Sequence, residues 1–125
     1  MAKSAPRKKQ TNSKLLARRI AQAAHDLKAT AIEVIDLGKL SSFTDFFVIA
    51  SGRSDRQVQA ICDRIQDDLA KQGRRPIGLE GYAKGHWVLV DFGEVVAHIF
   101  YEELRPFYSL EKLWGDAPRL KFRLK

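Results

Sequence analysis

The feature that most constrains the fold is a near-continuous apolar run at residues 45–50, which leads through a Ser-Gly-Arg-Ser turn into an amphipathic segment. Such a run is typical of a strand buried on both faces of a sheet. Ser54, with Gln57 three residues later, matches a capping-box pattern, and apolar residues then recur at helical spacing up to Leu69. Gly73 follows as a residue suited to ending a helix. The sequence therefore predicts a buried strand followed directly by a helix.

The remaining apolar patterns place further elements around this pair. They predict a helix over 14–28, strands over 30–37, 86–91 and 94–101, a weaker strand over 77–80, and short helices near 102–107 and 110–114. No internal repeat interrupts this order. Helices and strands in such an order are typical of one α/β domain. We therefore expect a single domain with a mixed β-sheet of four to five strands packed with helices.

The last two long strands are predicted to form a hairpin with Phe92-Gly93 as its loop, which would place Trp87 directly opposite His98. One face of this hairpin should belong to the core because it is wholly aliphatic: Val88, Val90, Val95, Ala97 and Ile99. The other face mixes aromatic and charged side chains, as protein interfaces do: Trp87, Leu89, Asp91, Glu94, Val96, His98 and Phe100. At this point two alternatives stay open, a partner-binding face or a face covered by a terminal helix.

The formal net charge of +7 is distributed unevenly along the chain. Residues 1–19 carry seven basic side chains and residues 119–125 carry four, without an acid in either segment, whereas residues 20–118 hold all fifteen acids against eleven basic residues. Basic ends attract phosphate, and an acidic body suits a basic protein partner. We expect a domain over 13–118 between flexible basic tails at 1–12 and 119–125. The tails would either contact rRNA or only improve solubility. A targeting presequence is a further interpretation of the N-terminal tail.

Residues suited to catalysis or metal binding are sparse. Asp91 and Glu94 flank the hairpin tip without the further carboxylate that a two-metal site would need. The three histidines lack metal-ligand spacing, and the lone Cys62 lies on an apolar helix stripe, where we expect a buried, inert thiol. The turn at 51–54 lacks the ending of a phosphate-binding loop, and no apolar run is long enough to span a bilayer. We therefore expect a cytoplasmic protein that is not an enzyme and has no cofactor, metal or membrane anchor.

Three blocks of the sequence resemble the ribosomal silencing factor family, also called Iojap or RsfS. They are Asp45–Val58, Glu80–Gly81 with Trp87–Phe100, and Arg105–Ala117. The resemblance covers about residues 14–118 and leaves out both basic ends. It implies a nucleotidyltransferase-like α-β-α fold that lacks the catalytic acids. It also implies that the protein binds ribosomal protein fourteen of the large subunit, blocks joining of the small subunit when nutrients are short, and often forms homodimers.

Together, the hairpin and the resemblance predict a partner-binding patch. Trp87 would anchor this patch. Its other contacts would come from Leu89, Asp91, His98, Phe100 and Tyr108, and basic side chains of the partner would meet Glu80, Glu102 and Glu111. Two alternatives remain open. A nucleotidyltransferase-like enzyme acting on an RNA end would show metal-dependent turnover, and a general RNA-binding module working through the basic tails would bind with steep salt dependence.

Overall fold

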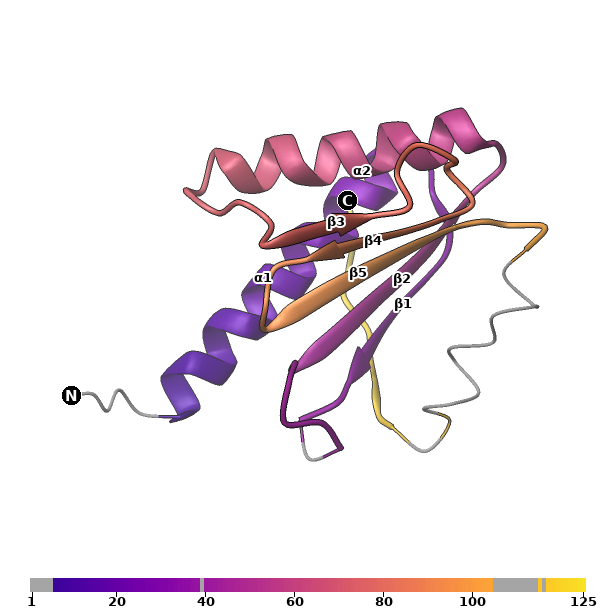
Figure 1. The fold of residues 1–125 in the computed structure, drawn as a ribbon. Coiled ribbons are helices and arrows are strands. Elements are labelled where there is room, and N and C mark those ends of the chain that lie inside the picture. The colour runs from indigo at the N-terminus through magenta and orange to yellow at the C-terminus, as the bar shows by residue number, and fades with distance from the viewer. Residues whose placement is uncertain (1–5, 39, 105–114, 116) are drawn as a thin grey trace.

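The computed structural model describes residues 6–38, 40–104, 115 and 117–125, and it contains one mixed sheet with two helices packed against it (Figure 1). The sheet order is β3-β4-β5-β2-β1-β6, in which β2 and β5 are parallel and the other neighbours are antiparallel. The elements are α1 (Pro6–Asp26), β1 (Thr30–Asp36), β2 (Phe46–Gly52), α2 (Asp55–Ala70), β3 (Gly78–Glu80), β4 (Trp87–Asp91), β5 (Val95–Tyr101) and β6 (Arg119–Leu120).

The strand and helix predicted from residues 45–73 are confirmed. In β2 only Phe47 is partly exposed, and the other six residues are buried. The hydroxyl of Ser54 accepts a hydrogen bond from the backbone N–H of Gln57 at 3.0 Å, and the Gln57 side chain accepts one from the backbone N–H of Arg53 at 2.6 Å. These contacts supply partners for N–H groups around the start of α2 that would otherwise lack them. Gly73 has the positive φ of 77° that suits the chain just beyond a helix.

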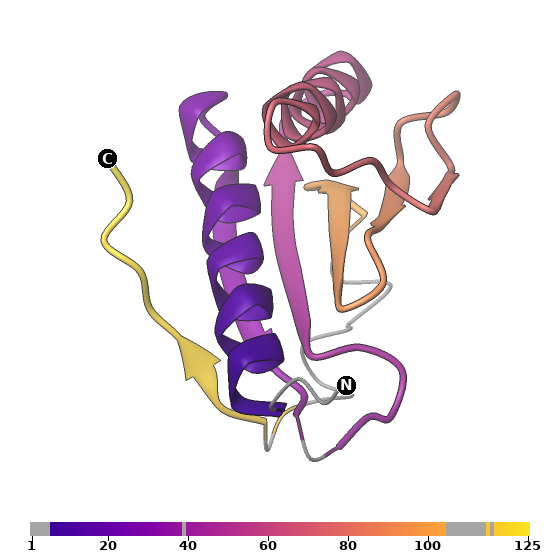
Figure 2. The same ribbon diagram turned by 90° about the vertical axis from the view of Figure 1, so that its left-hand side faces the viewer.

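Both helices lie on the same face of the sheet (Figures 1 and 2). The main core fills the space between them and the strands, and it includes the predicted aliphatic face of the β4–β5 hairpin, all five residues of which are fully buried. Cys62 belongs to this core, where burial and the nearby Asp63 carboxylate raise the pKa of its thiol to about 12. The expectation of a buried, inert thiol is thus confirmed. No helix among the described residues is long and apolar enough to cross a membrane.

Two details of the predicted sheet are wrong. The sheet has six strands instead of four to five, because a short strand near the C-terminus adds to its edge. The hairpin loop is Gly93-Glu94 instead of Phe92-Gly93, since the backbone N–H of Phe92 donates to the carbonyl of Val95 at 2.9 Å. Trp87 therefore lies opposite Phe100 instead of His98. Gly93 occupies the first loop position with a φ of 92°, a conformation that glycine adopts without steric cost.

The chain ends also differ from the expected flexible tails. Helix α1 begins at Pro6 instead of residue 14. At the other end, β6 pairs with β1, placing Leu120 opposite Val34. Leu120, Phe122 and Leu124 then pack against the main core. The short helices expected near 102–107 and 110–114 fall mostly outside the described residues, and the described part, 102–104, is a turn.

Candidate functional site

The face of the sheet opposite the helices carries a second apolar cluster. Its fully or nearly fully buried members come from β1, β2, β5 and the C-terminal part of the chain: Ile35, Leu37, Ile49, Phe100 and Ala117. Phe47 and Trp87 pack against them and stay partly exposed. An apolar cluster on the face that α1 and α2 leave uncovered makes this side of the sheet the place to look for a binding site.

Aromatic rings on β2, β4 and β5 give this face a fixed arrangement. The Trp87 ring stacks on Phe100 with centroids 5.3 Å apart, and the Phe47 ring meets His98 edge-on at 4.5 Å. The indole N–H of Trp87 donates a hydrogen bond to Nδ1 of His98 at 3.1 Å. Trp87 pairs with Phe100 across the hairpin, so His98 is its diagonal neighbour on the adjacent strand. Long aromatic side chains can contact each other across such a diagonal. Aromatic packing on both sides holds the His98 ring in one orientation.

His98 is a buried histidine with one free nitrogen. Only 4% of the residue is exposed, and this burial lowers the pKa of its imidazole to about 4, so the ring is neutral at pH 7. Because Nδ1 accepts the indole hydrogen bond, the remaining proton belongs on Nε2. Nε2 is itself buried, and it has no hydrogen-bond partner among the described residues. Leaving a buried donor unpaired costs about 1–3 kcal/mol, so an acceptor brought in by another molecule would be favoured here.

A groove with a volume of about 740 Å³ opens beside this imidazole. Its floor is formed by strand residues that include Leu89, Val96 and His98, and Asp91 adds a carboxylate. One wall is the loop 40–44, in which Phe43 is 91% exposed, and the other includes Ile77, which is 75% exposed. A mostly apolar hollow with a few polar groups is typical of a binding site. We call it the β4–β5 groove.

The structure brings together some of the predicted site residues and separates others. Leu89, Asp91 and His98 line the groove, and Trp87 lies next to His98. Phe100 is fully buried, so it supports Trp87 from within the cluster. Of the three glutamates predicted for the site, Glu80 and Glu102 are among the described residues. Both are exposed at strand ends, since Glu80 is the last residue of β3 and Glu102 directly follows β5. Tyr108 and Glu111 lie outside the described residues.

Sequence reasoning missed the walls of the groove. Phe43 lies in a polar loop, and Ile77 opens only the weakly predicted strand over 77–80, so neither position indicated a binding site. They line one groove because β4 and β5 lie between β3 and β2 in the sheet. The only available clue was a large apolar residue in a loop, a position where exposure is the normal outcome.

The acids at the hairpin tip have structural partners. Asp91 accepts a hydrogen bond from the backbone N–H of Gly93 at 2.7 Å, and Glu94 forms an ion pair with Arg74 at 2.8 Å. Among the described residues, no group of three or more His, Cys, Asp or Glu side chains is placed to hold a metal ion. The chemistry that this face offers is therefore shape, apolar contact, a hydrogen-bond donor at Nε2 and negative charge.

Comparison with known proteins gives consistent matches. A family model described as "Ribosomal silencing factor during starvation" matches residues 9–125. The protein named ribosomal silencing factor RsfS of Bacillus subtilis is 43% identical over 107 residues, which cover 86% of this chain and 91% of that protein. A mouse protein named "Mitochondrial assembly of ribosomal large subunit protein 1" is 36% identical over 89 residues, 69% of this chain and 39% of its own. A crystal structure from Bacillus halodurans superposes with a TM-score of 0.78 at 37% identity, covering 87% of this chain and 99% of that one.

Proposed function

Because the chain belongs to the ribosomal silencing factor family, we propose that it binds ribosomal protein fourteen of the large ribosomal subunit and thereby blocks joining of the small subunit. The observation that carries this proposal is the β4–β5 groove beside the Trp87–His98 pair, on the face of the sheet opposite the helices. The name of the mouse relative, which refers to the large subunit, supports the choice of subunit. The family model's reference to starvation supports a role when nutrients are short.

The groove suits a partner segment with one apolar side chain and one hydrogen-bond acceptor. The apolar side chain would lie between Phe43 and Ile77, and a carbonyl or carboxylate oxygen would accept from Nε2 of His98. Burial of a large side chain in such a site contributes about 1.5–3 kcal/mol. Trp87, partly exposed beside the groove, supplies the aromatic contact that dominates many interfaces.

Charge favours a basic partner. Residues 20–118 carry a net charge of −4, from fifteen acids and eleven basic residues. Asp91 lines the groove. Glu80 is exposed at the end of β3 and pairs with Leu89, which also lines the groove. Ribosomal proteins are typically basic, so complementary charge would speed the encounter and fix the orientation.

Silencing by this route needs no chemical step. A domain of this size is about 30 Å across, and a body of that width bound at the subunit interface would exclude the other subunit sterically. The partners of Asp91 and Glu94 support this mechanism, because both carboxylates already have structural roles. The cytoplasmic location and the homodimer expected from the sequence remain predictions.

Binding to purified large subunits tests the proposal. Phe43→Ala and Trp87→Ala should each weaken co-sedimentation with the large subunit by at least ~2 kcal/mol, or about thirtyfold in Kd. Phe43 is the cleaner site, because a residue that is 91% exposed contributes little to folding. Leu15→Ala is the matched control, since Leu15 is also an exposed apolar residue, at 48%, but lies on α1 on the other side of the sheet.

Three results would contradict the proposal. The first is equal sedimentation of the wild-type protein with both subunits. The second is a loss of binding in Leu15→Ala as large as that in Phe43→Ala. The third is failure of purified ribosomal protein fourteen to compete for the protein. The third result tests only the identity of the partner. If the groove binds another protein of the large subunit, Phe43→Ala would still weaken binding.

A further inference from the structure

The C-terminal segment 119–125, which begins with β6, has one apolar side and one basic side. Leu120, Phe122 and Leu124 are partly buried against the core, and all three line a small pocket of about 250 Å³ with residues of α1 and β1. The alternating residues Lys121, Arg123 and Lys125 are exposed. Because side chains alternate along an extended chain, the packing of one side fixes the direction of the cations on the other.

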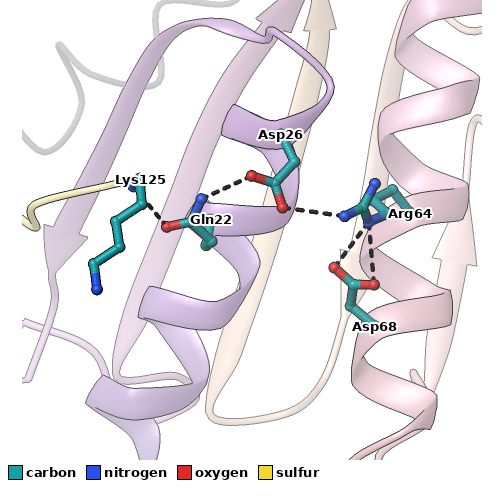
Figure 3. Close-up of polar contacts among 5 residues, drawn as sticks. All are labelled: Gln22, Asp26, Arg64, Asp68 and Lys125. Carbon is teal, nitrogen blue, oxygen red and sulfur yellow. Dashed lines mark hydrogen bonds and ion pairs between the residues drawn. The ribbon is translucent and has the colours of Figure 1, made fainter.

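Helix α1 lies beside this segment. The backbone N–H of Lys125 donates to the Gln22 side chain at 3.0 Å (Figure 3), and Ala21 lines the pocket beneath the segment. Lys14 and Arg18 are exposed on α1, and they precede Gln22 by eight and four residues. Residues four apart lie on one line of a helix, so both cations lie on the side of α1 that meets the C-terminal segment. The two ends of the chain thus form one surface.

We define the cationic strip as Lys14, Arg18, Lys121, Arg123 and Lys125. The sequence places no acid in residues 1–25 or 117–125. Two acids on the neighbouring elements are already paired, Asp26 with Arg64 at 3.1 Å and Glu33 with Arg119 at 3.1 Å. Within the described part of the chain, no ion pair joins a member of the strip to an acid. The positive charge of the strip is therefore available to another molecule.

We propose that the cationic strip binds the phosphate backbone of RNA. Exposed cations recur at every second residue of this segment. A fully extended chain would place them about 6.6 Å apart, which resembles the spacing of successive phosphates along a strand. Phosphate contacts of this kind bind without reading sequence. A membrane surface fits less well, because Leu120, Phe122 and Leu124 face the core and none is left for insertion into lipid. No residue of the strip lines the β4–β5 groove.

Fluorescence anisotropy with a short labelled RNA hairpin tests this inference. One variant of the full chain, the C-terminal variant, loses three cations of the C-terminal segment while keeping the apolar residues between them: Lys121→Gln, Arg123→Gln and Lys125→Gln. The matched control loses three exposed cations elsewhere: Lys71→Gln, Arg75→Gln and Lys84→Gln. A second strip variant, Lys14→Gln with Arg18→Gln, changes only the helix and covers the case in which the first variant disturbs β6.

The strip predicts a specific change in salt dependence. Each phosphate contact contributes about 0.7–0.9 to the slope of log K against log salt, so the C-terminal variant, which loses three cations, should lower that slope by about 2–3. The control should keep the wild-type slope, and the helix variant should lower it by about 1–2. Phe43→Ala should bind RNA like wild type, so this test and the test of subunit binding can fail independently.

Three outcomes would overturn the inference. The first is an equal loss of slope in the control and in the strip variants, which would mean that net charge alone attracts RNA. The second is loss of binding when the N-terminal cations Lys3, Arg7, Lys8 and Lys9 are neutralised, while both strip variants still bind. The third is a preference for phosphatidylserine vesicles over the hairpin with the same dependence on the strip, which would identify a lipid surface as the partner.

Discussion

His98 shows how its surroundings define the chemistry of one side chain. The sequence placed it correctly on the mixed face of the hairpin, and the structure adds burial, a hydrogen bond from Trp87 and an unpaired Nε2. None of these follows from the residue type, because they depend on Phe47 from another strand and on the exact register of the hairpin. The faces of β4 and β5 were nevertheless predicted correctly. A shift by two residues returns each side chain to the same face.

Burial of His98 should make folding stability depend on pH. The pKa of the imidazole falls from its ordinary 6.5 to about 4 in the folded protein. Between these values the unfolded chain binds a proton that the folded protein does not. The stabilisation is therefore complete above pH 6.5 and is lost as the pH falls towards 4, by about 3 kcal/mol in all. Urea denaturation at several pH values would measure this loss.

His98→Gln is the control for this measurement, because glutamine does not titrate and keeps an oxygen that can accept from Trp87. The difference in unfolding free energy between wild type and His98→Gln should shift in favour of the variant as the pH falls from 7 to 4. Parallel pH profiles for the two proteins would contradict the account of a buried, neutral imidazole.

At the scale of elements, sequence patterns predicted the main strands and both helices, but they failed where charge or length hid a pattern. The C-terminal segment alternates Leu120, Phe122 and Leu124 with cations, which is a strand pattern. Its high charge favoured the interpretation as a tail, whereas contact with α1 and β1 orders it. The loop of the β4–β5 hairpin was misplaced because Phe92-Gly93 and Gly93-Glu94 are both two-residue choices, and only the second puts Gly93 at the first loop position.

Gly81 lies between β3 and β4, and its backbone approaches the backbone of Trp87 closely. A Cβ at Gly81 would lie 2.1 Å from the carbonyl oxygen of Trp87, whereas a Cβ at Gly73 would meet nothing within 4 Å. Both glycines have a positive φ, so both substitutions to alanine carry a backbone cost of about 1–2 kcal/mol. Gly81→Ala should cost at least about 1 kcal/mol more, because the start of β4 must also move.

Thermal or urea unfolding of Gly81→Ala and Gly73→Ala would measure this difference. Gly81→Ala should also weaken binding to the large subunit, since Trp87 would shift with its backbone, while Gly73→Ala should bind like wild type. Equal destabilisation by the two substitutions would show that the turn at Gly81 does not position β4.

At the scale of the whole molecule, the protein carries two surfaces of opposite character that have no residue in common. The β4–β5 groove combines apolar walls with Asp91 and a buried donor, and the cationic strip combines α1 with the C-terminal segment. The sequence indicated an acidic body with basic ends, but it could not show that the ends meet each other. Nor could it show that the groove takes its walls from residues 40–44 and Ile77. Both surfaces depend on the sheet order, which single-sequence patterns do not determine.

Joining of purified ribosomal subunits, followed by light scattering, measures obstruction at the subunit interface itself. Large subunits would be incubated with saturating wild-type protein, Phe43→Ala or Leu15→Ala before small subunits are added. We expect wild type and Leu15→Ala to suppress joining, whereas Phe43→Ala should require about thirtyfold more protein for the same effect. If saturating wild-type protein leaves joining unchanged, obstruction through the β4–β5 groove is contradicted.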